Sequence, residues 1–424
     1  MIPSFNICNV DYDIRELHAV HDNAHLHRAV LRSLQRPLTV LLTNISGQLL
    51  PALSSPLFHA VPTASNQSAF PNGVQQYALS ISKFCEELLQ VFDELGLGID
   101  ADVRGDGLKG IRDGIVSVIN RVVNPFVASI RGELVPLIEA LENPNSTVAK
   151  VQPGAKSSVV YHPAIVSLQT LMPLYARALT TSTTSVLSQA TLASLLISIL
   201  WKAMVALSHR VDFKPSPMLS PETSNKKRRG SPSTSTTPPI TPPPGRFMIK
   251  LPPSRPPSPP STVCYASAAA DCKALYELLV TLPRPNSEQD STRLAREAVD
   301  EAYEGLKALP ALLDAVHNDR GRSEVNAGNL IQLTADIPSL IALPIILHAL
   351  GGPGTSSVAA VLGISDEEYR KACLSGFSRA EECSIAVTQR VLDVLQTNIE
   401  SNKTVIRWLE LELADIEESM TENL

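Results

Sequence analysis

Apolar residues recur at helical spacing along most of this chain. Between 107 and 142, for example, they stand three or four positions apart at Leu108, Ile111, Ile115, Val118 and Val122. The same spacing predicts helices over 11–35, 37–50, 74–95, 161–179, 184–211, 264–282, 288–317 and 324–350. No stretch alternates apolar and polar residues as a strand between hairpin turns would. The pattern therefore predicts an all-α protein made of one or more multi-helix bundles.

Prolines in the sequence indicate where some of these helices begin, bend or end. Pro37 is expected to begin a helix, because a proline in the first turn loses no hydrogen bond. Pro125 and Pro136 are expected to kink or split the helix over 107–142, since each removes an internal hydrogen bond.

The clearest helical signal lies near the end of the sequence. Ser365 followed by Glu368 predicts a capping box, in which each side chain bonds the other residue's backbone N–H. No proline follows, and the only later glycine is Gly376. One long helix is therefore expected from about 365 to 421.

The second half of this expected helix repeats every seven residues. We call its two mainly apolar rows the seam, which consists of Leu392, Leu395, Ile399, Asn402, Ile406, Leu409, Leu413, Ile416 and Met420. Such a repeat fits a coiled coil with a partner or with a second copy of the chain. It fits equally a bundle within the protein. The flanking positions carry no regular opposite charges, which favours the bundle.

A basic, proline-rich segment interrupts the helical pattern at 214–262, and we call it the tether. It holds 15 of the 33 prolines, 15 Ser or Thr residues and eight basic residues against the single Glu222, a net charge of +7. Because the whole chain carries −6, the remainder carries −13. Its scarcity of apolar residues predicts disorder. The tether separates an N-terminal helical segment, 1–213, from a C-terminal one, 263–424.

Short motifs in the tether suggest how it is used. The basic run Lys226, Lys227, Arg228 and Arg229 fits a nuclear import signal or a simple charged patch. Six candidate phosphorylation sites precede proline, namely Ser216, Ser220, Ser231, Thr237, Thr241 and Ser258. The prolines over 253–259 are of the kind that SH3 or WW domains bind. Nucleic-acid binding by the tether alone would be non-specific, and the acidic remainder argues against it.

Two apolar runs raise the question of a membrane or a lipid. The run 186–207 carries one charge, Lys202, and several polar residues, while 337–350 is short and contains two prolines. A buried core helix is the favoured interpretation of the first. The alternative is a lipid-binding, small-molecule-binding or membrane-associated protein that uses both runs.

Composition adds little specific chemistry. The start of the sequence lacks the charged and apolar regions of a secretory signal. Six dispersed cysteines fit reduced thiols inside a cell: Cys8, Cys85, Cys264, Cys272, Cys373 and Cys383. His21 and His25 could share a metal ion across one helix turn, but a solvated face is favoured and no metal is assigned. No catalytic motif or cofactor loop is present, although residues distant in sequence could still form a site.

These observations favour a non-enzymatic protein of the cytoplasm, the nucleus or both. The hypothesis is a helical interaction or scaffold protein that binds partner helices, or itself, through the seam. Phosphorylation of the tether would regulate it. We expect no catalytic, cofactor or metal residues.

Overall fold

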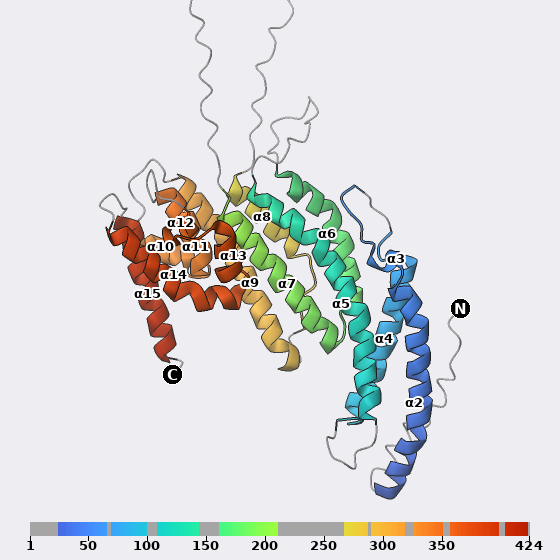
Figure 1. The fold of residues 1–424 in the computed structure, drawn as a ribbon. Coiled ribbons are helices and arrows are strands. Elements are labelled where there is room, and N and C mark those ends of the chain that lie inside the picture. The colour runs from blue at the N-terminus through green and yellow to red at the C-terminus, as the bar shows by residue number, and fades with distance from the viewer. Residues whose placement is uncertain are drawn as a thin grey trace, which may run out of the picture.

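The computed structural model describes residues 24–65, 69–99, 108–143, 161–210, 267–286, 290–318, 326–350, 357–397 and 403–422. All secondary-structure elements in these ranges are helices, which confirms the all-α prediction. In Figure 1 the helices follow one another across the molecule, from α2 at one end to α15 at the other. The tether, with its import and phosphorylation candidates, lies outside the described residues.

The first group of helices contains α2 (Ala24–Leu53), α3 (Pro56–His59), α4 (Gly73–Glu94), α5 (Lys109–Glu139) and the short 3-10 helix η1 (Ala140–Glu142). The long helices α2, α4 and α5 lie side by side in Figure 1. Asn72 and Gln75 form a capping box at the start of α4. The Gln75 amide also donates to the carbonyl oxygens of Phe58 and Ala60, so it holds α3 against α4.

Four prolines lie inside helices of this group, Pro37 and Pro51 in α2 and Pro125 and Pro136 in α5, contrary to part of the prediction. The expected boundary at Pro37 is wrong, because α2 continues through it. The expected split of the helix over 107–142 is wrong too, because α5 includes both Pro125 and Pro136. A proline removes one internal hydrogen bond, and burial of the surrounding apolar residues in the shared core offsets that loss.

The centre of the molecule is built from α6 (Pro163–Ser182), α7 (Val186–Ser208), α8 (Ala268–Leu279) and α9 (Asp290–Asn318). Helix α7 packs on α5 and, across the tether, on α9. Among the described helices it alone has the length and apolar composition needed to cross a membrane, but 67% of its most apolar stretch is buried inside the protein. Fully buried residues such as Leu196 and Ile199 contribute about 1.5–3 kcal/mol each.

The segments before and after the tether share one hydrophobic core. Besides α7 on α9, helix α6 packs on α8 and α7 packs on α11. A buried ion pair lies where the described chain stops and resumes: Arg210 Nη1 is 2.7 Å from Asp271 Oδ2. The other oxygen of Asp271 accepts a hydrogen bond from the backbone N–H of His162 at 3.1 Å. The two helical segments therefore close into one body.

The last group contains α10 (Ala327–Thr334), α11 (Ser339–Leu350), α12 (Val358–Leu362), α13 (Asp366–Cys373), α14 (Phe377–Thr397) and α15 (Lys403–Glu422). The capping box of Ser365 and Glu368 is confirmed at the start of α13. The single helix expected over 365–421 is wrong. The chain leaves the helix at Leu374–Gly376, and α14 packs against α15, which one straight helix could not do.

The described seam residues lie within this chain's own core. Leu392 and Leu395 of α14 are buried, as are Leu409 and Leu413 of α15, while Ile406 is half-buried. Ile399 and Asn402 lie outside the described residues, and so do the side chains of Ile416 and Met420. These five side chains therefore pack within the protein, as in the bundle that was the alternative to a coiled coil with a partner.

Candidate functional site

A charged cleft lies between the end of α5 with η1, the C-terminal half of α7, and α13. Its volume is about 490 Å³. Because α13 follows the tether and the other elements precede it, the cleft exists only where the two segments pack together. The residues that line it are Glu139, Glu142, Lys202, Val205, Ala206, Glu367, Arg370, Lys371, Leu374 and Ser375.

Two ion pairs fix the charged walls of the cleft. Lys202 of α7 lies 2.9 Å from a carboxylate oxygen of Glu139, at the end of α5. Arg370 of α13 binds Glu142 of η1 with both of its terminal nitrogens, one of them at 2.8 Å. A two-point contact of this kind sets the orientation of both side chains. The second pair therefore holds α13 in place against η1.

Two further charges in the cleft have no such partner. Glu367 and Lys371 stand four residues apart on α13, and both are exposed. No ion pair within the described part of the chain involves either side chain. They present one negative and one positive group at the cleft opening, where a bound molecule could reach them.

His209 lies at the end of α7, close to the cleft charges. Burial lowers its pKa; the hydrogen bond to the Val205 carbonyl and the nearby carboxylate of Glu142 oppose that effect, and Arg370 adds to it. Its Nδ1 lies 2.9 Å from the Val205 oxygen and 3.0 Å from the Ser208 hydroxyl. The ring is therefore neutral at pH 7 and is engaged by its own helix.

Trp201, a buried residue of α7, contacts the turn that follows α13. Its Nε1 donates to the carbonyl oxygen of Leu374 at 2.7 Å, and its ring lies 4.6 Å from the ring of Phe377. Both contacts hold the Leu374–Gly376 turn between α13 and α14. The sequence gives no sign of them, because 173 residues separate the bonded groups.

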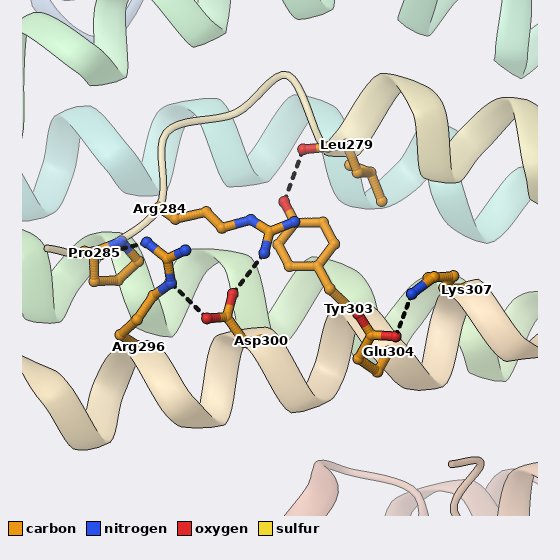
Figure 2. Close-up of polar contacts among 8 residues, drawn as sticks. All are labelled: Leu279, Arg284, Pro285, Arg296, Asp300, Tyr303, Glu304 and Lys307. Atoms are coloured by element: carbon orange, nitrogen blue, oxygen red, sulfur yellow. Dashed lines mark hydrogen bonds and ion pairs between the residues drawn. The ribbon is translucent and has the colours of Figure 1, made fainter. Parts of the chain in front are cut away.

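A second polar cluster, shown in Figure 2, fixes the turn after α8. Arg284 and Arg296 each donate to one oxygen of Asp300 at 2.6 Å, and Arg296 also donates to the Pro285 carbonyl. Burial opposes ionisation of Asp300, but these two arginines outweigh it and lower its pKa. Arg284 also lies 4.1 Å above the ring of Tyr303. With its carboxylate shared by two cations, this cluster is a structural clamp.

The residues singled out in the sequence fall elsewhere. His21 and the tether residues lie outside the described residues, and the side chain of His25 does too. Among the described side chains, no group of three or more His, Cys, Asp or Glu is placed to hold a metal. The five seam residues whose side chains are described pack in or against the core and do not line the cleft. From the sequence, the acids over 366–368 are recognisable only as residues that suit the start of a helix.

The chain has no match among the known proteins compared with it: no family model, no curated protein and no solved structure. Any function must therefore be argued from the geometry of the cleft and from the tether.

Proposed function

We propose that this chain is a non-enzymatic helical interaction protein whose cleft binds a charged segment of a partner protein. The observation that carries the proposal is the pair Glu367 and Lys371, which lies exposed and without an ion pair beside the two ion pairs of the cleft. A partner helix with one basic and one acidic residue four positions apart would match their spacing. The open, charged lining suits side chains of a protein better than an apolar small molecule.

The other cleft residues support binding over catalysis. Glu139, Glu142, Lys202 and Arg370 are already engaged in ion pairs that hold the walls. A general base would need a free group poised near the reacting atom. The imidazole of His209, which lies near the cleft charges, is bonded to its own helix.

The alternative of a lipid or small-molecule protein has less support. It would use the apolar runs 186–207 and 337–350, which contain nearly all of α7 and all of α11. Most of their large apolar side chains are buried in the core, from Leu195 and Leu196 to Ile341 and Ile346. Little apolar surface on these helices remains to meet a ligand or a bilayer.

Exchanging the two free charges tests the cleft. The double variant Glu367→Lys/Lys371→Glu keeps the net charge and the spacing, but it places charges of the same sign opposite those of the partner. We expect labelling of the bound partner to fall at least about tenfold in proximity labelling with quantitative mass spectrometry, which corresponds to ~1.4 kcal/mol.

A matched control exists on α8, where Lys273 and Glu277 are also exposed and four residues apart. The variant Lys273→Glu/Glu277→Lys should label the same proteins as the wild type. If the cleft variant and this control label identical sets in equal amounts, the cleft is not the binding surface.

We further propose that the tether directs the protein to its place in the cell and regulates it. Its run Lys226–Arg229 would direct nuclear import, and each phosphate added at a Ser/Thr-Pro site would bring about −1.5 to −2 charges against the tether's net +7. Replacing all four basic residues by alanine should remove a nuclear signal seen by fluorescence microscopy of the tagged full chain. An unchanged distribution would show that this run is not an import signal.

A further inference from the structure

Two cysteines meet where α13 turns into α14. Cys373 is the last residue of α13, and Cys383 lies in the second turn of α14. The Cys383 thiol lies close enough to contribute to the raised pKa of the Cys373 thiol. The Sγ of Cys383 also lies 3.7 Å from the carbonyl oxygen of Ala372, the residue before Cys373. The turn between the helices thus brings together sulfurs ten residues apart.

The surroundings distinguish these thiols from the other described cysteines. Cys85 and Cys272 are fully buried, whereas Cys383 is half-exposed and Cys373 is 8% exposed. Arg379 donates its Nε–H to the Ala372 carbonyl at 2.7 Å, and its charge lowers the pKa of Cys373 against the larger effect of burial. A nearby cation favours the thiolate, which is the reactive form.

The environment also separates the roles of the two sulfurs. Burial, followed by the hydrogen bond with Cys383, raises the pKa of Cys373 to about 11. Cys383 is the more accessible thiol and is the one that a small oxidant can reach. Tyr369, buried and without a hydrogen-bond partner for its hydroxyl, borders both sulfurs.

We propose that Cys373 and Cys383 form a reversible redox pair that closes to a disulfide by exchange with a low-molecular-weight disulfide such as oxidised glutathione. The Cys383 thiolate attacks one glutathione sulfur, breaks the sulfur–sulfur bond and releases one glutathione thiolate. Cys373 then loses its proton and attacks the Cys383 sulfur, which releases the second glutathione. Two electrons pass to the glutathione disulfide, and the two cysteine protons end on the two glutathione molecules.

Closing this bond would constrain the turn that contacts Trp201. The ten-residue span from Cys373 to Cys383 contains Leu374, which accepts the Trp201 hydrogen bond, and Phe377, which packs on its ring. The emission of Trp201 should therefore change on oxidation and return on reduction. The proposal concerns the thiols alone and stands whether or not the cleft binds a partner.

Mass spectrometry of the full chain after treatment with oxidised glutathione tests the proposal. Trypsin cuts after Arg379, between the two cysteines, and so yields separate peptides 372–379 and 380–390. We expect these two peptides to be linked in non-reducing digests and free after reduction. Cys383 should react at least about tenfold faster than the buried Cys85 and Cys272.

Single substitutions separate the two steps. In Cys373→Ser, Cys383 should accumulate as a mixed disulfide with glutathione, because the second thiol is missing. In Cys383→Ser, Cys373 should remain unmodified over the same time. The proposal is overturned if the wild type holds glutathione on Cys383 without linked peptides, or if Cys383 reacts no faster than Cys85.

Discussion

Glu86 illustrates, at the scale of one residue, what the sequence alone could not reveal. It lies on α4 and is 9% exposed, facing the start of α7. Thr184 donates its hydroxyl to Oε2 at 3.2 Å, while Oε1 has no hydrogen-bond partner. Burial raises the pKa of Glu86, and hydroxyls near the start of α7 offset part of the effect. Nothing in the local sequence separates it from the exposed Glu87.

The raised pKa of Glu86 gives a defined dependence on pH. Between its pKa in the unfolded chain and the higher pKa in the folded protein, the folded state binds more protons. The contribution of Glu86 to the free energy of unfolding therefore falls as pH rises across that interval. Its ionised form is a cost at pH 7.

Replacing this carboxylate by an amide should relieve that cost. Glu86→Gln is expected to raise the free energy of unfolding at pH 7, measured by urea denaturation, and the gain should shrink toward zero below about pH 4. Glu87→Gln, at an exposed site, should change stability by less than about 0.5 kcal/mol at both pH values. If Glu86→Gln instead lowers stability at pH 7, the hydrogen bonds to the carboxylate outweigh its burial.

At the scale of elements, periodicity locates most helices but not all of their ends. The helices expected over 74–95 and 161–179 match α4 and α6 to within a few residues, because their apolar repeat and caps agree. The helix start predicted at Pro37 is wrong, since α2 runs through this residue. A proline that would end a helix in isolation can lie inside one when burial of the surrounding residues against other helices stabilises the helix.

The C-terminal region shows a different limit. Of the five described seam positions, four are buried and Ile406 is half-buried, but a heptad repeat does not say what packs against them. In the structure, α14 packs against α15 and the rest of the core. The break at Leu374–Gly376 accepts a hydrogen bond from Trp201, which is distant in sequence. The cleft is unpredictable from the sequence for the same reason, because its residues come from three separate segments.

At the scale of the whole molecule, the tether divides the sequence but not the core. The buried pair of Arg210 and Asp271 has side chains 5% and 1% exposed. Loss of one member of such a pair typically costs about 3–5 kcal/mol. The pair lies at the two points where the described chain meets the tether region, and the helices on either side pack together. The cleft, with walls from both segments, depends on this closure.

Cutting the tether tests this closure most directly. A site-specific protease sequence placed between Ser235 and Thr236 would allow the folded protein to be cleaved without denaturant. Size-exclusion chromatography with light scattering then measures the mass of the product. We predict that both fragments elute together at the mass of the uncut protein and separate only in denaturant. Fragments that separate under native conditions would contradict a single core and, with it, a cleft built from both segments.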